Sequence, residues 1–123
     1  MTQGTSSERS PAAGSHGPAD VHPSQTTIAA FQQLIRDRYY TTDSARGVPG
    51  TFMWFIEEVG ELSTALQDNA PGKSPTAAER ANLEEEFADV LAWLTTLANI
   101  SGVSLERAIE KYSKPGRVEG VKS

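Results

Sequence analysis

Residues 54–62 read WFIEEVGEL and place three carboxylates, Glu57, Glu58 and Glu61, among large apolar side chains. Residues three apart lie on the same side of a helix, so Glu58 and Glu61 share a side. The acids of a surface helix normally lie opposite its apolar face. Here they border the apolar edge marked by Leu62, so something must balance their charge.

A matching pair of acids lies further along the chain, in the segment EEFADVLAWL at residues 85–94. Glu86 and Asp89 are again three residues apart and flank an apolar edge beside Trp93. The chain between the two pairs is long enough for a helix end, a loop and a return. If the two helices pack antiparallel, four carboxylates converge at the rim of the core.

Four converging carboxylates require protonation or a cation. Two like unit charges about 5 Å apart repel by roughly 3 kcal/mol at an effective dielectric constant of about 20. Ligands that are all oxygen suit Mg²⁺, with Mn²⁺ as a possible substitute. The residues therefore predict a metal site made of Glu58, Glu61, Glu86 and Asp89.

The alternative for each pair is a solvated helix face, because a single E-x-x-E pair is common on surface helices. Gly60 favours a site, since glycine inside a helix costs about 1 kcal/mol relative to alanine. A ligand or a neighbouring helix that approaches between Glu58 and Glu61 would account for this cost. The alternative for Gly60 is that it only permits tight helix packing.

The fold is predicted to be all-α, a bundle of about four helices, because apolar residues recur at helical spacing and nothing alternates as in a strand. The expected helices cover residues 26 to about 40, about 51 to 67, 76 to about 101, and 104 to 112. Gly47 and Pro49 separate the first two. Thr76 and Glu79 fit a capping box at the start of the third, and Gly102 ends it.

Two apolar stripes are expected to form the main packing face of the long helices. Their members are Phe52, Phe55, Ile56, Val59, Leu62 and Leu66 in one helix, and Leu83, Phe87, Val90, Leu91, Leu94, Leu97 and Ala98 in the other. Ala92 and Trp93 lie off the second stripe, so this helix has more than one apolar face. Pairing of two chains would bury both faces, so the bundle is expected to be completed by dimerisation.

The bulk composition excludes several classes of protein. The 123 residues carry a net charge of -5 and include no cysteine, so thiolate metal sites and a basic face for nucleic-acid polymers are not expected. No apolar run approaches the roughly 18 residues that cross a bilayer, and the N-terminus lacks the apolar core of a signal peptide. A cytoplasmic protein without a membrane partner is expected.

Two regions differ sharply in composition. Residues 1–24 are rich in Ser, Gly, Pro, Ala and Thr and have almost no large apolar side chains, which predicts a flexible tail. His16 and His22 lie in this tail and are not assigned to a metal site. Residues 25–123 are expected to form the single folded domain.

The segments EEVGEL at residues 57–62 and EEFADVLAWL at residues 85–94 resemble the MazG-like nucleoside triphosphate pyrophosphohydrolases of the all-α NTP pyrophosphatase superfamily. The shared pattern is E-x-x-E, a variable spacer and E-x-x-D, and the resemblance covers roughly residues 27 to 117. It implies that Glu58, Glu61, Glu86 and Asp89 hold Mg²⁺. It also implies dimers or dimers of dimers.

The activity implied by this resemblance is hydrolysis of a nucleoside triphosphate between its α- and β-phosphates, which yields a monophosphate and pyrophosphate. Glu57 or Glu58 is expected to orient or deprotonate the attacking water, with no choice between them from the sequence. House-cleaning of the nucleotide pool is the role that the family analogy suggests.

Cations are also needed for the triphosphate, and the resemblance points to Lys111, Lys114 and Arg117. The alternative is a basic helix end that complements the helix dipole. Asn99 resembles a nucleotide-contacting position but could only cap a helix. Trp54 could stack on a base, or pack in the core or a dimer. Weaker candidates of the same kinds are Lys73, Trp93, Tyr39, Tyr40 and Arg46.

Two rival functions share these residues. Phosphoribosyl-ATP pyrophosphohydrolase has the same fold and the leading acidic motif. A non-catalytic helical module would use the acidic rim to bind a metal or a basic partner, or would bind nucleotides without cleaving them.

Overall fold

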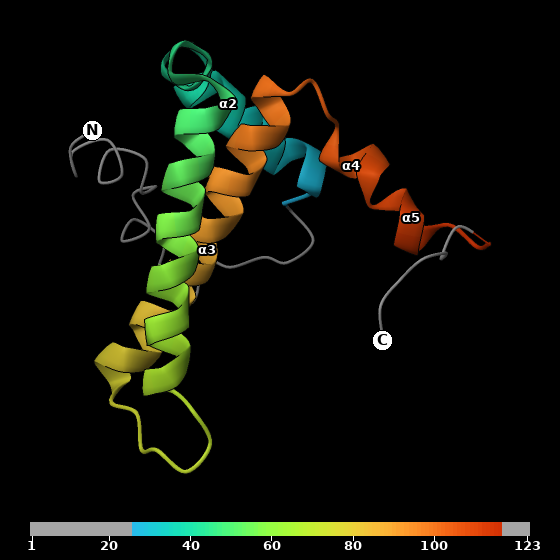
Figure 1. Cartoon of the computed structure of the whole chain (residues 1–123). Helices are drawn as coiled ribbons and strands as arrows, with labels where there is room; N and C mark the ends of the chain where they lie inside the picture. Colours follow the sequence, from blue (N-terminus) through green and yellow to red (C-terminus); the bar gives the residue numbers. More distant parts are fainter. Residues whose placement is uncertain (1–25, 117–123) are drawn as a thin grey trace.

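The computed structural model describes residues 26–116, and all regular elements in this range are helices. They are α2 (Ile28–Asp68), α3 (Ala77–Ile100), α4 (Leu105–Ala108) and α5 (Glu110–Ser113). The second part of α2 and the whole of α3 lie side by side and run in opposite directions, and α4 and α5 project from the end of α3 (Figure 1). The all-α prediction is confirmed. The predicted tail, with His16 and His22, lies outside the described residues.

α2 is broken by a bend at Gly47, which confirms the predicted separation of two helices there, but its first part continues to this bend, so the predicted end of the first helix near residue 40 is wrong. Gly47 has φ 80° and ψ 174°, a conformation essentially restricted to glycine. Pro49 follows in the first turn after the bend, where its missing N–H removes no helix hydrogen bond. The helix continues from residue 40 to the bend because Asp43 is buried there and accepts a hydrogen bond from Thr96 Oγ1 at 3.0 Å.

The turn between α2 and α3 is held by reciprocal hydrogen bonds that confirm the predicted capping box. Thr76 N donates to Glu79 Oε1 at 2.8 Å, and Glu79 N donates to Thr76 Oγ1 at 3.1 Å. Asn69 Nδ2 donates to the carbonyl oxygens of Ala65 and Glu79, which ties the end of α2 to the start of α3. These bonds direct α3 back along α2.

The face that α2 and α3 bury against each other differs from the predicted apolar stripes. The buried residues of the second part of α2 are Thr51, Trp54, Glu58 and Ala65, and those of α3 are Leu83, Glu86, Ala92, Trp93, Thr95, Thr96, Ala98 and Asn99. Only Leu83 and Ala98 belong to a predicted stripe. Most other stripe members stay exposed, including Phe52 at 50 % and Phe87 at 53 %.

The C-terminal segment begins as predicted but divides into two short helices. Ser104 Oγ accepts a hydrogen bond from Arg107 N and caps α4. Gln32 joins this segment to α2, because its side chain donates to Val103 O and accepts from Leu105 N. Among the described residues no single helix is long and apolar enough to span a membrane, although α3 together with the segment Leu105–Ser113, bent by 100°, meets the length and composition criteria.

Candidate metal centre

The acids of the two motifs meet between α2 and α3. Glu57, Glu58 and Glu61 form one group along α2, and Glu58, Glu86 and Asp89 form a second group across the two helices. Within each group, one carboxylate oxygen per residue lies within 4.8 Å of the others. Glu58 belongs to both groups, so it lies at the centre of the cluster.

Two of these acids are buried rather than placed at the rim of the core. Glu58 is 3 % exposed and Glu86 is 9 % exposed. They lie on the same helix faces as Trp54 and Trp93, because residues four and seven apart recur on one side of a helix. The prediction that these acids border the packing face was wrong, because the apolar stripes were expected to form that face.

Burial and mutual repulsion change the protonation of the cluster. Burial, followed by the charges of Glu61, Asp89 and Glu58, raises the pKa of Glu86 to about 7. Burial and the charges of Glu58 and Glu57 likewise raise the pKa of Glu61, and a hydrogen bond from Glu86 offsets part of this rise. No basic group contributes to either shift.

The cluster fits a hard divalent cation. All its ligands are carboxylate oxygens, which are the donors that Mg²⁺ and Mn²⁺ prefer. Glu86 Oε1 is buried and makes no hydrogen bond to the protein. A cation would satisfy this oxygen and remove the repulsion that raises the pKa of Glu86.

Gly60 has open space around it. A Cβ atom at this position would meet no protein atom within 4 Å, so tight packing between helices of one chain does not explain this glycine. Glu57 and Glu85, each next to a buried acid in the sequence, are exposed.

A buried layer of aromatic and polar side chains lies next to the acids. The rings of Trp54 and Trp93 stack with centroids 6.2 Å apart and an interplanar angle of 17°. The guanidinium of Arg46 lies 5.0 Å from the centroid of the Trp93 ring and forms an ion pair with Asp43 at 3.1 Å. Both tryptophans are therefore core residues of the chain.

The segment that carries these acids on two antiparallel helices matches the model of a known protein family. The family model of the MazG nucleotide pyrophosphohydrolase domain matches residues 49–115, more than half of the chain. The chain belongs to this family. No curated protein and no solved structure gave a significant match.

Family membership establishes the general chemistry of this MazG domain. It implies a nucleotide substrate and hydrolysis of an acid anhydride, and the two acidic groups could hold a metal ion. The match begins just after the bend at Gly47 and contains both groups of acids. The matched segment, residues 49–115, is shorter at both ends than the range of roughly 27 to 117 over which the sequence resembles the family.

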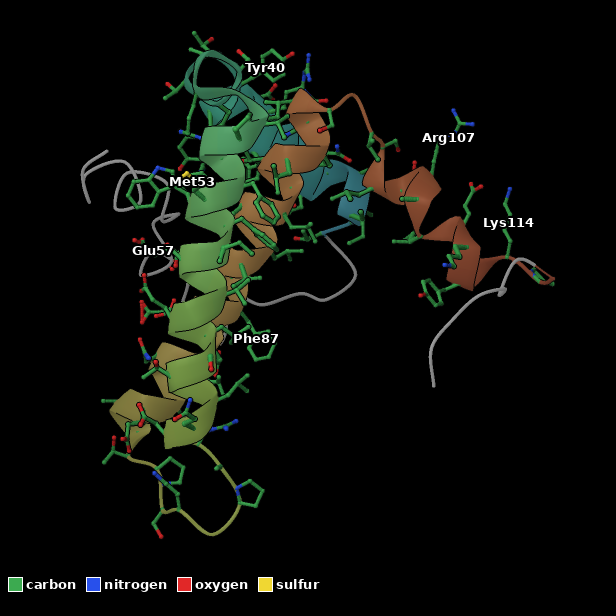
Figure 2. The ribbon with its side chains drawn as sticks, in the orientation of Figure 1. Tyr40, Met53, Glu57, Phe87, Arg107 and Lys114 are labelled. Carbon is green, nitrogen blue, oxygen red and sulfur yellow. The ribbon has the colours of Figure 1, made fainter. Side chains whose placement is uncertain are left out.

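The lysines predicted to bind the triphosphate lie far from the acids of the same MazG domain. Lys114 is on the projecting C-terminal segment, whereas Glu57 is on the opposite side of the molecule (Figure 2). Lys114 Nζ pairs with Glu110 at 3.4 Å, and Lys111 lies over the Tyr112 ring. One chain therefore does not bring these lysines and the acids together, and Arg117 lies outside the described residues.

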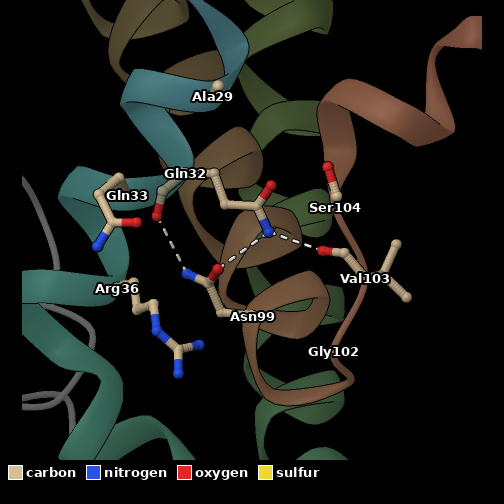
Figure 3. A pocket seen from close by; sticks show the side chains of 8 residues that line it. All are labelled: Ala29, Gln32, Gln33, Arg36, Asn99, Gly102, Val103 and Ser104. Atoms are coloured by element: carbon tan, nitrogen blue, oxygen red, sulfur yellow. Dashed lines mark hydrogen bonds between the residues drawn. The ribbon is translucent and has the colours of Figure 1, made fainter.

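Asn99 joins the first part of α2 to α3 instead of capping a helix end. Its Oδ1 accepts from Gln32 Nε2 at 3.0 Å, and its Nδ2 donates to Gln32 O at 3.3 Å. Gln32 and Asn99 line a cavity of about 340 Å³ together with Gln33, Arg36 and Gly102 (Figure 3). The cavity is formed where α2 begins and α3 ends.

Sequence reasoning missed the polar residues that surround Arg46. Asp43 stands in a stretch interpreted as a loop, and Thr51 and Thr96 carry no motif. Their bonds join residues up to 53 positions apart, which no local pattern indicates. The only available signal was an acid and an arginine three residues apart on a continued helix.

Proposed function

We propose that this MazG domain hydrolyses (deoxy)nucleoside triphosphates between the α- and β-phosphates, with Mg²⁺ as the cofactor. The position of Glu58 in two groups of carboxylates carries this proposal. Water would attack the α-phosphorus, and the oxygen that bridges the α- and β-phosphates would leave with pyrophosphate.

Glu58, Glu61, Glu86 and Asp89 would hold the cation. Glu58 and Glu86 are buried and come from different helices, so their positions are defined by the packing of α2 on α3. A bound Mg²⁺ would neutralise phosphate oxygens and acidify a water molecule. Mn²⁺ has the same ligand preference and is expected to substitute for it.

Glu57 is the better candidate for orienting the attacking water. It is exposed and belongs to only one of the two groups, whereas Glu58 belongs to both. Glu57 also lines a cavity next to the cluster, where a substrate would approach. We therefore assign Glu57 to the water and its proton, and Glu58 to the cation.

A second copy of the chain would cover the exposed stripes. Phe52, Ile56, Val59, Leu66, Phe87, Leu91 and Leu94 are all at least 37 % exposed. Such contiguous apolar surface is typical of an interface. Phe87 lies on the side of the helix pair away from Glu57, so pairing there would leave the acidic cluster open (Figure 2).

The basic C-terminal segment fits the same assembly. Ile109 and Tyr112 on this segment are 43 % and 59 % exposed, so it has apolar surface available to another chain. Lys114, and Lys111 on α5 just before it, would reach a triphosphate only from a neighbouring chain, because this segment projects away from the acids of its own chain.

The experiment that tests the function compares Glu61→Gln with Glu85→Gln. Mutation of a residue that only supports a metal ligand typically lowers metal affinity or activity about 10- to 100-fold. Loss of Glu61, a proposed ligand, should therefore lower pyrophosphate release at least about a hundredfold. Glu85 is exposed and belongs to neither group, so its variant should retain activity. The substrates are the canonical triphosphates, modified triphosphates and phosphoribosyl-ATP, with Mg²⁺ or with chelator.

Binding of Mn²⁺, followed by electron paramagnetic resonance, gives a second readout. Turnover of phosphoribosyl-ATP alone would assign the activity to histidine synthesis. Metal binding with no turnover of any substrate would contradict the proposal and leave a non-catalytic metal-binding module.

A further inference from the structure

Arg46 has one edge of its guanidinium without a partner. Its side chain is only 7 % exposed. Nη1 donates to Asp43 Oδ1 at 3.1 Å and to Thr51 Oγ1 at 3.2 Å. Nε and Nη2 are buried and have no hydrogen-bond partner. These two atoms form one edge of the planar group, so both donors of that edge are unsatisfied together.

The surrounding residues hold this guanidinium in place. Asp43 is 1 % exposed and is itself held by Thr96 Oγ1 at 3.0 Å. The guanidinium lies 5.0 Å from the centroid of the Trp93 ring. Gly50 makes room for the arginine stem, because a Cβ atom there would lie 3.0 Å from Arg46 Cγ. The free edge is thus a rigid pair of donors.

This residue lines a cavity that adjoins the acidic cluster. The cavity has a volume of about 360 Å³, and its walls are Arg46, Gly50, Met53, Trp54 and Glu57. Glu57 belongs to one group of acids, so the cavity begins at the candidate metal centre. Seven residues separate Glu57 from Gly50, which is roughly 10 Å along the helix axis. A nucleoside spans about this length.

We propose that this cavity receives the nucleobase and that the free edge of Arg46 reads two adjacent acceptors on it. This inference rests on the proposed function, which places the phosphates at the acids. Guanine and hypoxanthine present O6 and N7 side by side, and arginine binds this pair through two donors. Cytosine presents O2 and N3 in the same way. Adenine has its amino group beside N7 and N1, and uracil has the N3–H donor between its two carbonyl oxygens, so neither base offers two adjacent acceptors and each satisfies only one of the two nitrogens.

A base fits this cavity better than a phosphate does. Asp43 already neutralises the charge of Arg46, which removes most of the attraction for an anion. Met53 and Trp54 provide apolar walls, and Glu57 would repel a phosphate that lay between them.

Access to the two donors requires a side chain to move, because both are buried. Met53 lines the cavity and is 74 % exposed and unbranched, so its side chain can adjust to a ligand there at little cost. Buried donors that lack a partner are costly, so a ligand that supplies two acceptors gains from satisfying them.

The test is isothermal titration of non-hydrolysable α,β-methylene analogues of GTP, CTP, ATP and UTP in the presence of Mg²⁺. The variant Arg46→Lys retains a positive charge beside Asp43 but has no paired donors. We expect it to weaken binding of the GTP or CTP analogue at least about tenfold, and to change binding of the ATP and UTP analogues much less. Arg38→Lys, at an exposed position of the same helix, is the matched control.

Gly50→Ala provides a second variant if Arg46→Lys does not fold. Its added Cβ would displace the stem of Arg46, so the same analogues should lose affinity. Equal loss for all four analogues would overturn the base assignment and place a phosphate at Arg46. Unchanged binding in both variants would overturn any contact with the nucleotide. Failure of the proposed function appears differently, because the unmodified chain would then hydrolyse no nucleotide, whether or not it binds the analogues.

Discussion

At the scale of single residues, the acids between α2 and α3 combine like charge with burial. Glu58 and Glu86 are buried close to other carboxylates, although bringing like charges together away from water is costly. Burial and three neighbouring acids disfavour the charged form of Glu86, which raises its pKa. The site is therefore poised to take up a cation or a proton.

Metal-free protein should become less stable as the pH rises through 7. The pKa of Glu86 is about 7 in the folded chain, whereas a glutamate free of these neighbours, as in the unfolded chain, has a pKa of 4.5. The folded state therefore binds the proton more tightly. The resulting stabilisation is present at low pH and is lost as the pH rises through the folded value. Between pH 6 and pH 8 the free energy of unfolding should fall by about 1 kcal/mol.

Urea denaturation with chelator, at fixed protein concentration, measures this change. Glu86→Gln should remove most of the difference, and a saturating divalent cation should reverse its direction, because the cation binds the deprotonated form. An equal decrease in the Gln variant would show that other groups are responsible.

At the scale of elements, α2 owes its shape to one glycine. Gly47 has φ 80° and ψ 174°, and the bend it forms lets the first part of α2 cross the end of α3. The bend places Asp43 against Thr96 and Gln32 against Asn99. Arg46, the last residue before the bend, is thereby brought to the cavity beside the acids.

Gly47→Ala should therefore destabilise the chain by about 1–3 kcal/mol, the cost of a side chain in this conformation. Thermal or urea unfolding measures the change. Gly60→Ala is the matched control, because Gly60 is helical and a Cβ there meets no atom within 4 Å. That variant should be about 1 kcal/mol more stable in the metal-free state. Equal effects of the two substitutions would contradict the role of the bend.

At the scale of the whole molecule, one chain leaves its most apolar surface uncovered. The exposed stripes of α2 and α3 are the residues that the periodicity predicted as core. The chain buries instead a face with several threonines, two glutamates and two tryptophans. A second copy of the chain, as proposed above, would cover the stripes, and assembly would then contribute to the stability of the fold.

Phe87→Glu should dissociate this assembly, because it places a charge in the centre of an apolar interface. Analytical ultracentrifugation should show a shift to monomer and a lower melting temperature. Leu34→Glu, at a residue 41 % exposed on the first part of α2 and outside the stripes, should leave the mass unchanged. A monomeric unmodified chain would contradict the expected pairing.

The helices and the two acidic motifs could be predicted from local patterns in the sequence. The period of the apolar residues, the capping box at Thr76 and the two E-x-x-E/D motifs are local patterns, and they led directly to the all-α fold and to the family. These features were predictable because each depends on residues within one or two helical turns.

The helix faces that pack against each other could not be predicted in this way. Both the stripe and the face that contains Trp54 are apolar enough to pack, and periodicity cannot choose between two such faces. The choice depends on contacts between distant residues, such as Asp43 with Thr96, and it buries Glu58 and Glu86. It also creates the cavity at Arg46, because the bend at Gly47 brings that residue back over Trp93.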